Sequence, residues 1–464
     1  MSKVDGLGVM LDHVLCTPGA RVPERARAAT RKFVLDSLGV GVNGSSGPHV
    51  DALLEMYRAQ DGVGVAGVLG TNVRLAPAAA AFMNAYQIHN SEYDCVHELA
   101  VVHPMAVMLG AITATVWQLH AAGTEVSGEE LEVAITLAID VAAGLGIASA
   151  APLSFFRPGT AGAFAATMAV ARLRGFSIER ARNAVGILLG QLSGTMQAHI
   201  EGSAVLAMQV GFNARNALVS CDMAAAGIVG PQDSLQGPFG FFALFEGAYD
   251  LEPVLNSLGH DWRIEEVAHK PFPSGRATHG IVDACLSMRR EFGFNASAVA
   301  SVSAFVPPLT QRLVGRPVRA DMNVNYARLC APYVTAVALL GGDVQPEDFS
   351  ATALVNAATL ELAARVDVVI DGNTDPNALT PIRVVVNLRD GSRHELTLSA
   401  IYGNPASPML RAAYIEKLRK NLRRARDPIV DVDNCADTVI AVVETLSKVR
   451  SAAKLLQLLQ AEPS

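Results

Sequence analysis

The sequence predicts a mainly α-helical protein in which a smaller α+β domain is inserted into a large all-helical domain. In residues 1–265, apolar side chains recur at helical spacing, and few segments alternate with a period of two. Between residues 266 and 399, β-branched runs are interleaved with helices, and residues 400–464 return to helix. We therefore expect an all-helical domain formed by residues 1–265 and 400–464, with an α+β domain at residues 266–399.

Proline and glycine mark the expected helix ends in the first half. Pro104 and Pro158 stand near first helical positions, and Gly123 and Gly175 follow the expected ends. The first helix should stop at the glycines that follow residue 38. Small residues dominate these helices, which favours close packing between them. The expected helices are 25–40, 75–89, 104–122, 128–148, 159–174 and 178–192.

Three β-branched segments and a hairpin define the expected sheet. The last segment continues through the turn Asp390-Gly391 into a further strand, as is typical of a β-hairpin. The expected strands are 300–306, 366–370, 382–388 and 394–398. Further helices are expected at 276–291, 326–340, 351–365, 411–426 and 436–461.

Composition excludes several classes of protein. The chain has a net charge of −7 and no basic block, which argues against a nucleic-acid partner. Its six cysteines are scattered without a CxxC pair, and the N-terminus lacks the apolar core of a signal peptide, so we expect a cytoplasmic protein. Residues 133–153 are strongly apolar but contain Asp140, which favours a buried helix over a membrane segment. We therefore expect no membrane partner.

The densest polar cluster lies between two apolar helices, at residues 88–98 and His103-Pro104. It offers three histidines and three carboxylates, more titratable groups than a helix connection needs. A solvated loop with capping side chains, a catalytic loop of general acids and bases, and a metal site are the three interpretations. The spacing matches no known zinc signature, so we expect no metal. The metal interpretation would use His89, Asp94, His97 and His103.

Two further segments suggest an acidic substrate. His103 stands beside the start of a helix, where free backbone N–H groups favour an anion, and Arg157 repeats this arrangement with a guanidinium. Residues 269–279 combine Lys270, Arg276 and two histidines at the entry to the predicted α+β domain. This segment suits either a hinge or a pocket between domains. Glycine motifs for phosphate binding and the GxSxG motif of hydrolases have no support.

Seven segments in this order resemble the MmgE/PrpD family, whose members include 2-methylcitrate dehydratase, cis-aconitate decarboxylase and iminodisuccinate epimerase. The resemblance implies a helical domain with an inserted α+β lid domain, a homodimer, and a pocket between domains. It also implies removal or shift of a proton next to a carboxylate of a small di- or tricarboxylic acid, without a cofactor. The segments are 35–39, 92–97, 103–104, 157–162, 270–273, 331–333 and 403–405.

The sequence departs from the family pattern at proton-handling positions. Leu206 occupies the position of a lysine in the family pattern, and Gln209 occupies the position of a histidine. A second family histidine is also absent, and Arg157 is the residue nearest to its position in the sequence. Cys95 and Val96 replace an acid and a hydroxyl. A smaller acid/base set favours an epimerase-like or substrate-divergent member over a standard 2-methylcitrate dehydratase. A catalytically silent member that binds a polycarboxylate or serves in an assembly is the alternative.

The resemblance and the residues together assign roles. His103 is the expected acid/base, with Asp94 and His97 orienting it and Tyr333 as a proton donor on the opposite face. Cationic side chains should bind carboxylates and stabilise enolate-like charge. The expected catalytic residues are His103, Asp94, His97, Tyr333 and Lys270. The expected substrate-binding residues are Glu92, Arg157, Gln209 and Arg276.

Overall fold

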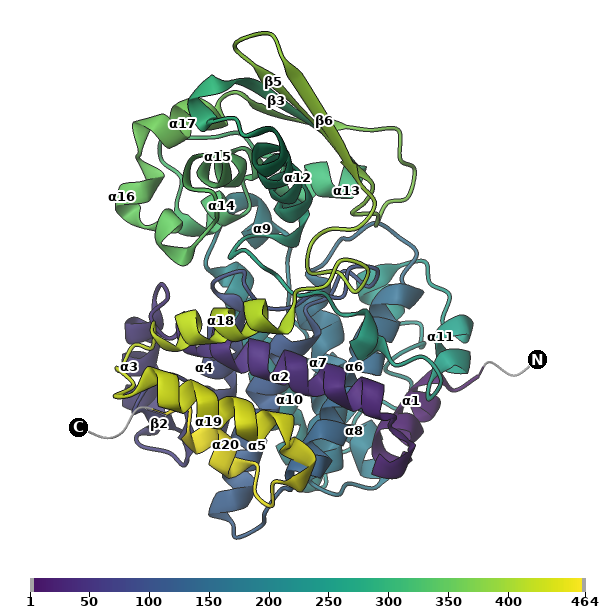
Figure 1. Cartoon of the computed structure of the whole chain (residues 1–464). Coiled ribbons are helices and arrows are strands. Elements are labelled where there is room, and N and C mark those ends of the chain that lie inside the picture. Colours follow the sequence, from purple (N-terminus) through teal and green to yellow (C-terminus); the bar gives the residue numbers. More distant parts are fainter. Residues whose placement is uncertain (1–3, 461–464) are drawn as a thin grey trace.

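The computed structural model describes residues 4–460 and is mainly helical. Most helices form the lower part of the molecule in Figure 1, and a four-stranded sheet with its own helices forms the upper part. The lower part contains α1 (Gly6–Cys16), α2 (Glu24–Gly44), α3 (Val50–Asp61), α4 (Pro77–His89), α5 (Pro104–Ala121), α6 (Gly128–Ala148), α7 (Arg157–Leu173), α8 (Ile178–Leu189), α10 (Val205–Ala225) and α11 (Glu252–Ser257). A hairpin of two short strands, β1 (Ala66–Gly67) and β2 (Arg74–Leu75), precedes α4.

Helices α5, α6 and α7 form the centre of the large apolar core. Helix α4 packs closely on α5 at Gly110, where a Cβ would lie 2.5 Å from Ala85 Cβ on α4. Helix α6 is long and apolar enough to cross a membrane, but 94% of its most apolar 18-residue stretch is buried inside the protein. Helix α6 is therefore a core helix, in agreement with the close packing predicted from its small residues.

The sheet has the order β4-β3-β5-β6, with β4 parallel to β3 and the other pairs antiparallel. Its strands are β3 (Val299–Val306), β4 (Val366–Ile370), β5 (Ile382–Leu388) and β6 (Arg393–Leu398). Helix α12 (Arg276–Phe292) packs against β5 and β6, and its Ile281 and Cys285 belong to the same buried apolar cluster as Val384 and Val386 of β5. The other helices of this part are α13 (Pro308–Val314), α14 (Val324–Arg328), α15 (Ala331–Gly341), α16 (Ala351–Leu354) and α17 (Ala357–Ala363).

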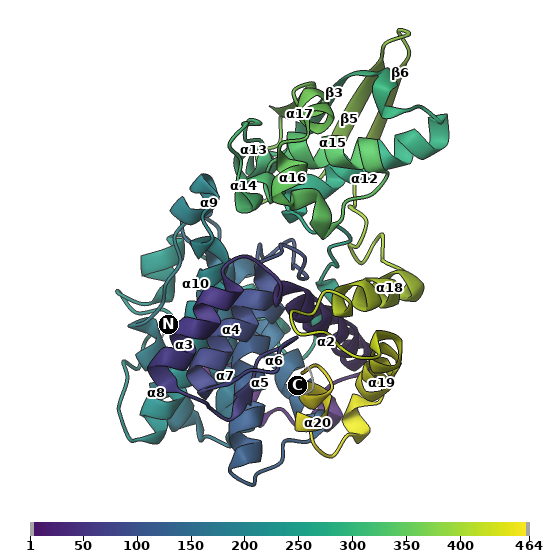
Figure 2. The ribbon, with the colours of Figure 1, turned by 90° about the vertical axis from the view of Figure 1, so that its left-hand side faces the viewer.

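After the sheet the chain returns to the first group of helices. Helix α18 (Arg411–Leu422) packs on α2, and α19 (Val432–Glu444) and α20 (Ala453–Gln457) follow beside it (Figure 2). This path agrees with an inserted α+β segment. That the segment forms a separate lid domain with boundaries at residues 265 and 400 stays a prediction.

Four expected helices differ from the structure. Helix α2 continues to Gly44, so Gly39 does not end it. Gly39 instead allows α18 to approach closely, because a Cβ there would lie 2.7 Å from Leu418 on α18. The expected helix 326–340 is broken into α14 and α15, and Pro332 stands in the first turn of the second. The expected helix 351–365 is broken where Asn356 caps α17. The expected helix 436–461 is broken between α19 and α20, and residue 461 lies outside the described residues.

Candidate active site

A small cavity lies between the loop that precedes α5 and the start of α12. Its volume is about 80 Å³, and Gly275 and Ala277 at the start of α12 form part of its wall. Its polar lining consists of His89, Glu92, His103, His199 and Arg276. Its apolar lining includes Leu153, Phe156, Met196, Leu206, Leu313 and Leu379. The cavity therefore has a charged end and an apolar remainder.

The loop between α4 and α5 is held on both sides. His97 and Val102 pair as an antiparallel bridge within the loop, and Val96 pairs with Ala268, two residues before Lys270. Glu92 has a φ of 52°, in the left-handed region that side chains rarely adopt. The following helix begins with Pro104, and His103 is its N-cap residue. Local turn and cap geometry therefore brings residues from both ends of the loop together.

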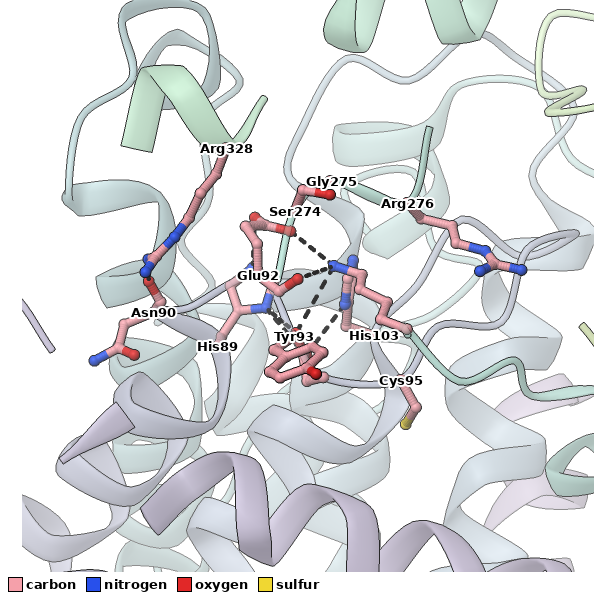
Figure 3. A network of polar contacts seen from close by, with 12 residues as sticks. His89, Asn90, Glu92, Tyr93, Cys95, His103, Ser274, Gly275, Arg276 and Arg328 are labelled. Carbon is pink, nitrogen blue, oxygen red and sulfur yellow. Dashed lines mark hydrogen bonds and ion pairs between the residues drawn. The ribbon is translucent and has the colours of Figure 1, made fainter. Parts of the chain in front are cut away.

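Asp94 is the centre of the polar network beside the cavity, and Figure 3 shows His89, Glu92 and His103 of this network. Its carboxylate is fully buried and lies 3.1 Å from Nδ1 of His103 and 3.1 Å from Nδ1 of His89. Lys270 Nζ lies 2.8 Å from Glu92 Oε2 and 4.0 Å from Asp94 Oδ1. The two histidine rings meet edge to face, with centroids 4.7 Å apart. Two cations and two carboxylates thus share one small volume.

Burial and neighbouring charges separate the pKa values of these groups. Burial lowers the pKa of His103, and the charge of Lys270 adds to this effect, although Asp94 opposes it. Burial would also lower the pKa of His89, but the charges of Asp94 and Glu92 outweigh it and raise this pKa. Burial would raise the pKa of Glu92, but the charges of Lys270 and the histidines hold it at about 2. Burial would likewise raise the pKa of Asp94, and the two histidines hold it well below its ordinary value.

These shifts are opposite in direction, so His89 keeps its proton to a higher pH than His103. Neutral His103 donates its Nδ1–H to Asp94, which leaves the lone pair on Nε2. The His103 side chain is 13% exposed, the most open of the histidines in this network. His89 also donates Nδ1–H to Asp94, and its buried Nε2 has no hydrogen-bond partner among the described residues. Two histidines with oppositely shifted pKa values therefore lie side by side, an arrangement that suits proton transfer.

The two arginines expected to bind substrate are engaged elsewhere. Arg157 is fully buried, and its guanidinium makes hydrogen bonds of 2.9–3.1 Å to the carboxylate of Glu246 and one of 3.2 Å to Ala100 O. Arg276 reaches the cavity wall, but its Nε donates to Glu98 at 2.6 Å and its other nitrogens donate to carbonyl groups of the chain. Neither guanidinium offers a free donor pair to a carboxylate.

Asp94 and Lys270 contact the lining residues His103 and Glu92 but do not themselves line the cavity. Three other expected site residues lie outside this cluster. Tyr333 donates its hydroxyl to Asp348 O at 2.7 Å and lies in the core around α15. Gln209 forms hydrogen bonds with the backbone N–H and carbonyl of Thr195. His97 Nε2 lies 2.9 Å from the carboxylate of Glu266, so it does not orient His103. The structure therefore brings together His103, Asp94, Lys270 and Glu92, and separates these three from them.

Two residues were missing from the expected catalytic and substrate-binding sets. His89 was named only for the metal interpretation, and its place in the polar cluster, five residues before Asp94, was a usable signal. His199 comes from the short helix α9 (Gln197–Glu201) and lines the opposite part of the cavity. Burial and the charge of Arg316 lower the pKa of His199 to about 4, so its ring is neutral. No motif in the sequence marked it.

The same cluster is the candidate for a metal ion. His89, Asp94 and His103 each offer one ligand atom, and these atoms lie within 4.8 Å of one another. Both histidines, however, already face the Asp94 carboxylate through Nδ1 at hydrogen-bond distance, and Lys270 places a positive charge beside it. A metal ion bound to Asp94 would be repelled by the positive charge of Lys270. The residues fit a proton-transfer site better than a metal site.

Comparison with known proteins supplies the family. Residues 11–254 match the MmgE/PrpD N-terminal domain, and residues 272–435 match the MmgE/PrpD C-terminal domain. A cis-aconitate decarboxylase-like protein, oryM, of Aspergillus oryzae is 25% identical over 446 residues, covering 90% of this chain and 92% of that protein. The cis-aconitate decarboxylases of Mus musculus and Homo sapiens are 25% and 23% identical, covering 93% and 94% of this chain and 88% and 91% of their own lengths. These two domain matches cover most of the chain and show that it belongs to the MmgE/PrpD family.

Proposed function

We propose that this protein is an enzyme that removes a proton from the carbon next to a carboxylate of a small acid. The observation that carries this proposal is the pair formed by Asp94 and His103 beside the cavity, with Nε2 of His103 left free. The relatives named cis-aconitate decarboxylases support an enzyme that acts on carboxylic acids.

His103 acts as the base in this proposal. Its Nε2 takes the proton, and the electrons of the broken C–H bond move into an enolate of the substrate carboxylate. Asp94 stabilises the imidazolium that forms, because its carboxylate accepts the Nδ1–H at 3.1 Å. Protonated His89 and Lys270 lie beside the developing negative charge and stabilise it electrostatically.

The fate of the enolate distinguishes the possible reactions. Return of a proton to the same carbon gives an epimerase, whereas loss of a neighbouring group gives a lyase. The family lysine aligned with Leu206 and the family histidine aligned with Gln209 are both absent, which favours proton return over protonation of a leaving group. The decarboxylase relatives favour a lyase, so the products must decide between the two.

Proton NMR in deuterium oxide tests the proposal. The panel contains methylcitrate, citrate, cis-aconitate, iminodisuccinate, tartrate and a set of small monocarboxylic acids. We expect loss of one α-proton signal with at least one acid, without a new alkene signal for an epimerase and with a new product for a lyase. His103→Gln should abolish this exchange.

His97→Gln is the matched control, because His97 lies in the same loop but faces Glu266. It should retain exchange. Full exchange by His103→Gln would overturn the proposal. Binding of an acid by thermal shift, without exchange of any proton across the panel, would instead support the catalytically silent alternative.

A further inference from the structure

The charged side chains that line the cavity already have partners before a substrate enters. Glu92 pairs with Lys270 at 2.8 Å, and His89 pairs with Asp94 at 3.1 Å. His199 is neutral, since burial and Arg316 lower its pKa to about 4. Among the described residues that line the cavity, none offers a spare cation for a second or third carboxylate.

One end of the cavity can still hold a single carboxylate. Helix α12 begins at Arg276 without a side-chain cap, and Gly275, Arg276 and Ala277 line the cavity there. The first N–H groups of a helix have no partner within it, and no hydrogen bond in the described part of the chain uses those of Arg276 and Ala277. The residues that carry these two donors line the same cavity as His89 and His103.

His89 supplies an independent sign of an anion at this end. Its ring is 1% exposed, it lines the cavity, and its Nε2 has no hydrogen-bond partner among the described residues. Glu92 Oε1 lies 3.7 Å from this nitrogen, which is beyond hydrogen-bond length. Once His89 is protonated, this buried N–H requires an acceptor, and a substrate carboxylate supplies one.

The rest of the wall is apolar. Leu153, Phe156, Met196, Leu206, Leu313 and Leu379 line it. Leu206 stands where the family pattern places a lysine, so an apolar group replaces the cation that could meet another carboxylate. A carboxylate held against these side chains would lose its hydration without gaining a partner.

We propose that the substrate carries a single carboxylate, bound between His89 Nε2 and the start of α12, and an uncharged apolar remainder that packs along Leu206. This inference rests on the proposed function, because it places the α-carbon beside His103. The proposed substrate differs in charge from cis-aconitate, the tricarboxylate specified in the names of the relatives.

Calorimetric binding to the wild-type protein tests the inference with matched probes. 2-Methylbutanoate has one carboxylate, methylsuccinate has two and cis-aconitate has three, and 2-methylbutanamide is the uncharged control. We expect 2-methylbutanoate to bind at least ten-fold more tightly than cis-aconitate and than the amide. Tighter binding of cis-aconitate would overturn the inference.

Two variants test the two ends of the site. Ala277→Pro removes one helix N–H donor at a position where α7 already carries Pro158, and it should weaken binding of 2-methylbutanoate several-fold. Leu206→Lys should shift the preference at least ten-fold towards cis-aconitate, whereas the uncharged control Leu206→Met should keep the wild-type preference. Equal preference in the lysine and methionine variants would contradict the assigned apolar end.

The proton-exchange assay keeps this test distinct from the proposed function. If cis-aconitate binds more tightly and undergoes exchange that depends on His103, the single-carboxylate inference fails and the proposed chemistry stands. If 2-methylbutanoate binds as expected but no acid in the panel undergoes exchange, the proposed chemistry fails while the binding site stands.

Discussion

The buried pair of Arg157 and Glu246 distinguishes a structural arginine from a substrate-binding one. Arg157 is fully buried and Glu246 is 6% exposed, and three hydrogen bonds of 2.9–3.1 Å join them. Arg157→Met leaves the carboxylate buried without a partner, which should lower the free energy of unfolding by about 3–5 kcal/mol. The double variant Arg157→Met/Glu246→Met removes both charges and fills the space with side chains of similar volume.

The double variant should recover most of the lost stability. Replacing a buried ion pair by apolar side chains is often neutral, and the remaining cost is the hydrogen bond to Ala100 O, about 1 kcal/mol. Urea denaturation of the wild type, both single variants and the double variant gives the coupling free energy between the two positions. Proton exchange measured on the same samples shows whether the recovered protein is active.

Two results would refute the structural role. A single variant Arg157→Met that loses less than about 1 kcal/mol of stability would show that the pair is not holding the fold. A double variant that regains stability but binds carboxylate probes at least ten-fold more weakly would show that the guanidinium reaches substrate. Glu246→Gln is the control for the carboxylate, because it leaves a neutral acceptor beside Arg157.

Three further predictions concern the polar network and its surroundings. Proton exchange should rise with pH as His103 is deprotonated, with a midpoint below 6.5, and fall above 6.5 as His89 loses its proton; a pH–rate profile measures both limbs. Tyr333→Phe should retain exchange and lose about 1 kcal/mol of stability in urea, because only its hydrogen bond to a carbonyl is removed. Since the pKa of Glu92 falls from 4.5 to about 2, its ionised form should stabilise the protein by about 3 kcal/mol above pH 4.5, a contribution lost as pH falls towards 2. The stability difference between the wild type and Glu92→Gln, followed by urea denaturation from pH 6 to pH 2, should shrink accordingly.

Local patterns in the sequence were sufficient for the elements and for half of the polar network. Pro104 marks the start of α5, which makes His103 the cap residue, and Asp94 lies a short loop before it. Both features depend on neighbours within about ten residues, so spacing predicts them. The Asp390-Gly391 turn predicted the hairpin of β5 and β6 for the same reason.

Partners distant in the chain were not predictable in this way. A sequence shows that Arg157 carries a guanidinium, but Glu246, which neutralises it, lies 89 residues further on. Arg276 meets Glu98 across 178 residues. Tyr333 follows the motif of the family, yet the orientation of α15 places its hydroxyl on Asp348 O. Packing decides whether a charged side chain faces substrate or another part of the protein, and residue type does not reveal it.

The charge balance of the cavity connects the departures in the sequence to the choice of substrate. A site shielded from water must pair each charge it holds, so each substrate carboxylate requires a donor or cation that is free before binding. With Arg157 and Arg276 engaged, and with leucine at position 206, the described residues that line the cavity leave one such place, at His89 Nε2 and the start of α12. Arg316 Nη1 and Arg328 Nε also lack hydrogen-bond partners among the described residues, but neither arginine lines the cavity. In the proposed mechanism the base is His103, which does not depend on the replaced lysine. The proposed chemistry at carbon is therefore compatible with a less charged acid.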